Sequence, residues 1–124
     1  MQIRVYYEDT DTGGVVYHSN YLNFCERARS QAFFDKNLTP MLEHGHFVAR
    51  KIMGDFYKSA KLGDLIEVET RLVKMKNASF VLSQTIYRKE EKIFDLEITL
   101  AYIDFEGNPQ KIDVNTKELI LKLF

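Results

Sequence analysis

One long segment of this chain, residues 20–36, repeats its apolar side chains with a helical period. Apolar or small residues spaced three and four apart share one face of a helix, and here that face holds Tyr21, Phe24, Cys25, Ala28 and Ala32. Ser19 or Asn20 can cap the first turn, and Asn37 can end the last. The alanines on this face would allow close contact with a sheet, so the sequence predicts a helix packed against strands.

The segment before this helix predicts a strand and then a loop. Residues 2–8 alternate between apolar and polar positions, which is typical of a half-buried strand. This alternation puts Ile3, Val5 and Tyr7 on the core-facing side. Residues 9–18 follow as a loop, with a pair of glycines as its flexible joint.

The segment after the helix predicts a meander of strands. Strands are expected at 46–60, which holds one or two, and at 65–75, 79–89 and 92–104, where apolar and polar residues alternate cleanly in the last stretch. A short helical turn is expected at Thr39-Pro40 and an amphipathic helix from Asn115 onwards. This order of elements predicts the α+β class, with one antiparallel sheet around one helix, as a single domain over 1–124.

Composition restricts the classes of function. The net charge of −1 provides no basic excess, so a nucleic-acid partner is not expected. The lone Cys25 excludes an internal disulfide and suits a reducing compartment. No apolar run approaches the roughly 18 residues of a membrane span, and the N-terminal segment lacks the apolar core of a signal peptide. These features predict a soluble cytoplasmic protein.

Residues 8–21, EDTDTGGVVYHSNY, form the densest cluster of chemically active residues in the chain. Their acidic start superficially follows a calcium-binding EF-hand loop. However, Gly13 and Asn20 occupy the positions at which that loop needs a side-chain oxygen and a bidentate glutamate. A zinc site is not expected either, because no ligand spacing joins His18, His44 and His46. The sequence predicts no metal and no cofactor.

A solvated turn is the plain alternative for this cluster, since Asp and Gly are common turn residues. Two features argue against it. Three carboxylates crowd together and repel one another. The glycines also lead directly into the start of a helix, which places free backbone N–H groups beside an acid. An acid facing an oxyanion-type donor set is what acyl transfer requires.

Residues 5–29, VYYEDTDTGGVVYHSNYLNFCERAR, closely resemble the opening motif of YbgC-like acyl-CoA thioesterases, in the 4-hydroxybenzoyl-CoA thioesterase branch of the hotdog superfamily. The order of the remaining elements also fits, so the resemblance covers essentially the whole chain. It implies a hotdog fold, in which a curved antiparallel sheet wraps around the long helix. It also implies a homodimer or homotetramer with the active site between subunits. The implied substrate is an acyl thioester of coenzyme A or of an acyl carrier protein.

The resemblance also implies roles for individual residues. The catalytic carboxylate falls on Asp11, as nucleophile or as general base. The backbone N–H that polarises the thioester carbonyl falls on His18, whose imidazole is a candidate donor to the leaving thiolate. The functional tyrosine falls on Tyr7. The expected substrate-binding residues are Gly14, Val15, Val16 and Tyr17, together with Lys76 and Asn77.

Cations near strand ends could contact the phosphates of coenzyme A, although ordinary surface lysines are an equal alternative. Besides Lys76, they are Lys58, Lys61 and Lys74.

Two other functions and one other nucleophile remain open. A hotdog dehydratase or hydratase would pair His18 with Glu26 on the helix, but it does not require the acidic, glycine-rich loop. A non-catalytic acyl-binding dimer would be expected to lose Asp11, which is present. Cys25 could in principle form a nucleophilic pair with His18, but its place on the apolar face indicates an inert core thiol.

Overall fold

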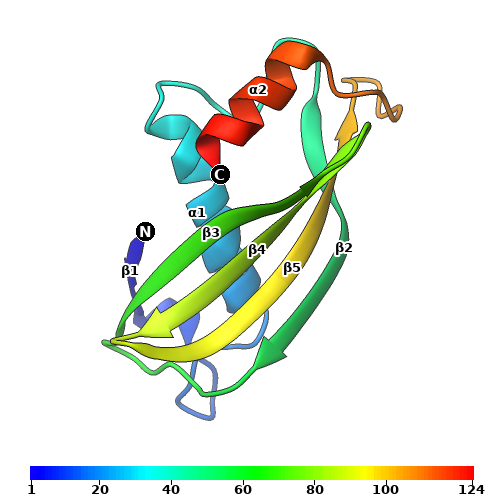
Figure 1. The fold of residues 1–124 in the computed structure, drawn as a ribbon. Helices are drawn as coiled ribbons and strands as arrows, with labels where there is room; N and C mark the ends of the chain where they lie inside the picture. Colours follow the sequence, from blue (N-terminus) through cyan, green and yellow to red (C-terminus); the bar gives the residue numbers. More distant parts are fainter.

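The computed structural model of the protein describes residues 1–124 as a curved sheet wrapped around a helix (Figure 1). The elements are β1 (Gln2–Arg4), a short 3-10 helix (Tyr7–Asp9), α1 (Asn20–Phe34), β2 (His46–Phe56), β3 (Leu65–Met75), β4 (Ser79–Arg88), β5 (Glu91–Ile103) and α2 (Val114–Leu123). The five strands form one sheet in the order β1-β3-β4-β5-β2, and every pair is antiparallel. The predicted α+β class is confirmed.

The core lies between α1 and the concave face of the sheet. The predicted apolar face of α1 is confirmed for Tyr21, Phe24, Cys25 and Ala28, which are all buried, whereas Ala32 is only half-buried. The alternation in β5 is confirmed as well, because its core-facing positions are buried: Phe94, Leu96, Ile98, Leu100 and Tyr102. No helix is long and apolar enough to cross a membrane.

A buried polar side chain links α1 to the sheet in a way that the alternation did not predict. Gln84 of β4 is fully buried, and its Nε2 donates hydrogen bonds to Cys25 O and Thr70 Oγ1, both at 2.9 Å. Its Oε1 accepts a 2.9 Å hydrogen bond from Nη1 of Arg29. Burial lowers the pKa of the Arg29 guanidinium, which has no carboxylate within ion-pair distance.

The predicted first strand is too long, and the prediction that Tyr7 faces the core is wrong. The strand ends at Arg4, and the side chain of Tyr7 is 83% exposed on a 3-10 turn. The cause is Asp9, whose Oδ2 accepts a 2.9 Å hydrogen bond from Tyr6 N and closes the turn. This local hydrogen bond competes with strand geometry, so the alternation stops after Val5.

Three other local predictions need correction. Ser19 occupies the N-cap position of α1 without a side-chain capping bond. Thr39-Pro40 forms no helical turn; Thr39 Oγ1 instead accepts a hydrogen bond from Met41 N in a bend. The last helix starts at Val114, one residue earlier than expected, because Asp113 caps it by accepting from Thr116 N.

Candidate active site

The loop between the 3-10 helix and α1 is fastened to the rest of the fold along its length. Val16 N donates to Ala60 O at 2.9 Å, which joins the loop to the segment after β2. The carbonyl oxygen of Asp9 accepts from Tyr17 N at 2.9 Å and from Asn20 Nδ2 at 3.0 Å. These bonds hold both ends of the loop together at the end of the sheet where β2 stops (Figure 1).

The two glycines shape a tight turn around Asp11. Asp11 Oδ1 accepts a 2.8 Å hydrogen bond from Gly13 N, and Asp11 O accepts from Gly14 N at 3.0 Å. Gly14 has φ of +79°, a conformation that glycine adopts without strain. The second carboxylate oxygen of Asp11, Oδ2, has no hydrogen-bond partner in the chain, and the residue is exposed. The turn therefore presents one oxygen of the acid to whatever occupies the space beside it.

The backbone N–H of His18 is also unpaired. It donates to no acceptor in the protein, although its neighbour Tyr17 does. His18 lies two residues before the first residue of α1, where the positive end of the helix dipole adds to the attraction for negative charge. Its imidazole is exposed and lies against the ring of Tyr17, with ring centroids 4.4 Å apart.

Asp11 and His18 line one shared hollow of about 270 Å³. The other residues around it are Val15, Val16, Tyr21, Phe56, Tyr57, Lys58 and Ser59. Tyr21 fixes the far wall, because its hydroxyl oxygen accepts a buried 3.0 Å hydrogen bond from Ala60 N. Two residues with an unpaired polar group, the Asp11 carboxylate and the His18 backbone N–H, therefore line one partly apolar hollow. An acid and an N–H donor are the groups that addition to a carbonyl group needs.

The remaining predicted site residues differ in whether they lie at this hollow. Val15 and Val16 line the hollow, Gly14 forms the turn, and Tyr17 lies beside His18. Tyr7 does not line it.

Lys76 and Asn77 lie at the opposite end of the sheet. The turn that holds them is bonded to Tyr102, which pairs with Phe47 at the start of β2. The hollow adjoins Phe56 at the end of β2, roughly 30 Å of strand away at about 3.3 Å per residue. Within one chain, therefore, these two residues are not part of the site.

The residues of the alternative functions are not brought together either. Glu26 lines a separate hollow of about 190 Å³, and its Oε1 accepts a 2.9 Å hydrogen bond from Ser30 Oγ. Cys25 is fully buried, and burial raises the pKa of its thiol to about 12, with a smaller opposing effect from Arg29. This thiol stays protonated at neutral pH and does not line the hollow with His18.

Sequence reasoning missed the wall formed by residues 56–59. These residues were included in a predicted strand of 46–60, but the strand ends at Phe56 and the chain then runs along the Asp11 loop. Their pairing partners are distant in sequence, so no local pattern identifies them. Tyr21 was predicted only as a core residue; its hydroxyl bond to Ala60 N is a second role.

Comparison with known proteins places this chain in a family. Residues 13–94 match the model of the thioesterase superfamily. The acyl-CoA thioesterase YbgC of Helicobacter pylori (strain ATCC 700392 / 26695) is 44% identical over 113 residues, which cover 84% of this chain and 85% of that protein. The acyl-CoA thioester hydrolase YbgC of Escherichia coli O157:H7 is 38% identical over 106 residues, covering 82% and 79%.

Solved structures agree with the sequence relatives. The crystal structure of a probable thioesterase from Bartonella henselae superposes with a TM-score of 0.85 and 32% identity, covering 91% of this chain and 97% of that one. The predicted hotdog fold, a curved antiparallel sheet around one central helix, is confirmed. The extent of the family match and the identity to curated relatives lead to one conclusion: this chain belongs to the thioesterase superfamily, among the YbgC-like acyl-CoA thioesterases.

Proposed function

We propose that this protein hydrolyses acyl-CoA thioesters to a free acid and coenzyme A, with Asp11 as the catalytic carboxylate. One observation carries the proposal: the unpaired Oδ2 of Asp11 and the unpaired N–H of His18 belong to residues of the same hollow. The names of the curated relatives, acyl-CoA thioesterase and acyl-CoA thioester hydrolase, support the substrate class.

In the proposed reaction, the thioester carbonyl oxygen accepts a hydrogen bond from His18 N–H. The donor and the helix dipole then stabilise the negative charge that develops on this oxygen. Asp11 either adds to the carbonyl carbon itself or takes a proton from the water that adds. The carbon–sulfur bond breaks, the coenzyme A thiolate leaves, and the oxygen of water ends in the product acid. In the covalent route, water hydrolyses the resulting anhydride with Asp11.

The backbone and the side chain of His18 can be tested separately. His18→Ala keeps the N–H, so the oxyanion contact survives and only the imidazole is lost. A thiolate is a good leaving group, so proton donation is less necessary than for an amine. We therefore expect kcat/KM to fall by up to about a hundredfold, less than for Asp11→Asn. An unchanged kcat/KM in a folded variant would restrict His18 to its backbone N–H.

The protein is proposed to be a homodimer or homotetramer. The outer edge of β2 is unpaired over eleven residues, while β5 occupies its other edge. Apolar side chains along it are exposed, among them Met53 at 60% and Phe56 at 56%. Long apolar edge strands favour pairing with another strand. Phe56 also lines the Asp11 hollow, so pairing along β2 would bring a second subunit to the site. A monomer at micromolar concentration in sedimentation velocity would contradict this proposal.

Three further expectations stay proposals. Contacts of Tyr7, Lys76 and Asn77 with substrate would have to come from a partner subunit, and Tyr7→Phe is the mildest test of the first. Acyl carrier protein remains a second possible carrier of the acyl group. A cytoplasmic location is proposed because the lone Cys25 suits a reducing compartment.

The experiment is thiol release from short-chain, long-chain and aromatic acyl-CoA esters by the wild type, Asp11→Asn and Glu26→Gln. Hydrolysis by the wild type and by Glu26→Gln, with loss in Asp11→Asn, supports the proposal. Loss in Glu26→Gln alone would assign the catalytic acid to the helix instead of to Asp11. A folded wild type that releases no thiol from any ester would contradict the proposal.

A further inference from the structure

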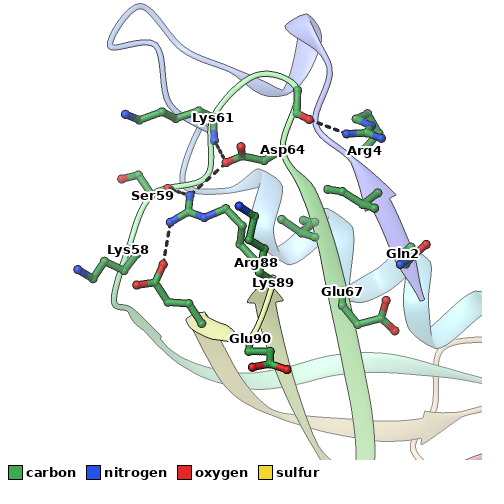
Figure 2. Close-up of a pocket in the computed structure, with 14 residues that line it drawn as sticks. Gln2, Arg4, Lys58, Ser59, Lys61, Asp64, Glu67, Arg88, Lys89 and Glu90 are labelled. Atoms are coloured by element: carbon green, nitrogen blue, oxygen red, sulfur yellow. Dashed lines mark hydrogen bonds and ion pairs between the residues drawn. The ribbon is translucent and has the colours of Figure 1, made fainter.

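Arg88, the last residue of β4, joins three segments of the chain with one guanidinium group (Figure 2). Its Nη1 donates to Ser59 O, after β2, at 2.6 Å and to Asp64 Oδ2, before β3, at 3.1 Å. Its Nη2 donates to Glu91 Oε1, at the start of β5, at 2.9 Å. The side chain of Arg88 is only 25% exposed. The guanidinium is therefore a fixed junction between segments that the sheet ladder does not connect directly.

The position of Ser59 depends on this guanidinium. The carbonyl oxygen of Ser59 accepts its single hydrogen bond from Arg88, and neither the N–H nor the hydroxyl of Ser59 forms one. The residues on both sides are held independently of Arg88. Lys58 N donates to Ile93 O at 3.2 Å, and both backbone groups of Ala60 are hydrogen-bonded. Without Arg88, Ser59 would have no hydrogen bond at all.

The loop that holds Asp11 is bonded to the residues that follow Ser59. Ala60 O accepts from Val16 N at 2.9 Å, and Lys61 forms a β-bridge with Val15. Val15 O in turn accepts from Asp11 N at 2.9 Å. A shift of the backbone at Ala60 would therefore move the Asp11 loop or break one of these bonds.

Arg88 supports the site from outside. It does not line the Asp11 hollow, whereas Ser59 and its neighbour Lys58 do. Arg88 lines a separate polar basin of about 1040 Å³, whose wall Lys58 and Ser59 also form. An effect of Arg88 on the reaction in the hollow would therefore act either through this shared wall or through its charge, and a test has to separate the two.

An ordinary surface ion pair is the plain alternative, and such pairs contribute little to stability. Two features argue against it. The shortest contact of the guanidinium goes to the uncharged carbonyl of Ser59, which two opposite charges do not need. Asp64 Oδ2 also accepts from Lys61 N at 2.9 Å, which fixes the carboxylate that orients Arg88.

Both charges of the Arg88–Asp64 pair are present at neutral pH. Hydrogen bonds with Glu91 and Asp64 raise the pKa of Arg88. Although partial desolvation raises the pKa of Asp64, hydrogen bonds from Lys61 N and Arg88 outweigh it and hold this pKa below its usual value. The contact between the guanidinium and Ser59 is therefore oriented by a charged partner under ordinary conditions.

We propose that Arg88 is a positioning residue for thioester hydrolysis, which holds Ser59, and through Ala60 the Asp11 loop, in the arrangement that the reaction needs. The inference rests on the proposed function, in which Asp11 acts on the thioester carbonyl. A guanidinium suits this role because its planar fork binds several acceptors in fixed directions, whereas an ammonium is a point charge. A displacement of about 1 Å in a group that takes part in a reaction can lower the rate by about a hundredfold.

The test measures kcat and KM for one acyl-CoA ester with the wild type, Arg88→Met and Arg88→Lys, and with Lys89→Met as the matched control. Lys89 follows Arg88 in the β4–β5 turn, lines the same basin and has no ion-pair partner. Its variant removes the same charge and leaves the bond to Ser59 intact. Rates are expressed per folded protein, from circular dichroism. Amide hydrogen exchange of Val16 N–H, followed by NMR, measures the coupling without any substrate.

We expect kcat of Arg88→Met to fall by about tenfold while KM changes by less than about twofold, because the placement of Asp11 suffers and the contacts with the ligand remain. Arg88→Lys should lose about threefold in kcat, since one ammonium cannot bridge three acceptors from separate segments. Lys89→Met should keep the wild-type kcat. Val16 N–H should exchange about tenfold faster in Arg88→Met, while amides in the middle of β5 keep the wild-type rate.

A wild-type kcat in folded Arg88→Met would overturn the inference. Equal losses in Arg88→Met and Lys89→Met would overturn it too, because they would assign the effect to charge alone, and so would a change confined to KM. If Arg88→Met does not fold, Arg88→Lys decides, and a wild-type kcat with wild-type exchange of Val16 N–H would refute the coupling. Activity lost in Asp11→Asn but kept in both Arg88 variants would leave the proposed function standing without this inference. An inactive wild type would refute both.

Discussion

Gln84 is the side chain whose replacement should most clearly loosen α1 from the sheet. Gln84→Met keeps the side-chain length but removes three hydrogen bonds of 2.9 Å, one of them from the charged Arg29. A hydrogen bond to a charged group contributes about 1.5–3 kcal/mol, and a neutral one about 0.5–1.5 kcal/mol. Allowing for the favourable burial of methionine, we expect the free energy of unfolding to fall by about 3 kcal/mol. For a domain of this size the Tm should drop by about 10 to 15 °C.

The assay is urea unfolding followed by circular dichroism, with Gln31→Met as the control. Gln31 bonds only to Asp35 on the helix surface, so its variant should stay within about 0.5 kcal/mol of the wild type. The double variant Arg29→Met, Gln84→Met should recover part of the loss, because no half-buried guanidinium is then left without its acceptor. Equal stability of Gln84→Met and Gln31→Met would refute the reasoning.

Three other predictions concern folding, reactivity and pH. Gly45→Ala should lower the free energy of unfolding by more than about 2 kcal/mol, measured by urea unfolding, because a Cβ at this position would overlap the carbonyl oxygen of Ile103. Cys25 should resist a thiol reagent at mildly alkaline pH in the native protein and react only after unfolding, because burial raises its pKa to about 12. The pKa of Asp64 in the folded protein lies below its ordinary value of 3.8. Its pair with Arg88 therefore makes its full contribution to stability at pH values above that ordinary value. That stability is lost as pH falls through the lower folded value; Asp64→Asn should therefore lose less stability than the wild type on acidification in thermal melts.

Periodicity predicted the parts of the fold in which one face is buried along a whole element. The strand predicted at 65–75 is β3, with the same ends, and β5 differs from its predicted range by one residue at each end. The helical face of α1 also came directly from spacing. In each case several side chains along one face are buried and together define the period. A single polar residue at a buried position, such as Gln84 in β4, does not hide such a pattern.

Contacts between distant segments could not be predicted from the sequence. Tyr7 matched the alternation of the first strand, but one hydrogen bond of Asp9 turned the chain before that residue. Lys58 and Lys76 carry the same side chain near strand ends, and only the sheet register puts Lys58 beside Asp11 and Lys76 at the other end. The motif identified the loop that holds Asp11 and His18. The wall opposite them depends on tertiary pairing.

The role of Asp11 is tested most directly by single-turnover hydrolysis with enzyme in excess over an acyl-CoA ester. This measurement isolates the chemical step from product release. Asp11→Asn keeps the size of the side chain, and its amide oxygen can still accept from Gly13 N, so the turn should remain folded. The account predicts that the rate constant for thiol release falls at least about a hundredfold while coenzyme A binding is retained. A rate constant within a few fold of the wild type, in a variant with an unchanged circular dichroism spectrum, would contradict it.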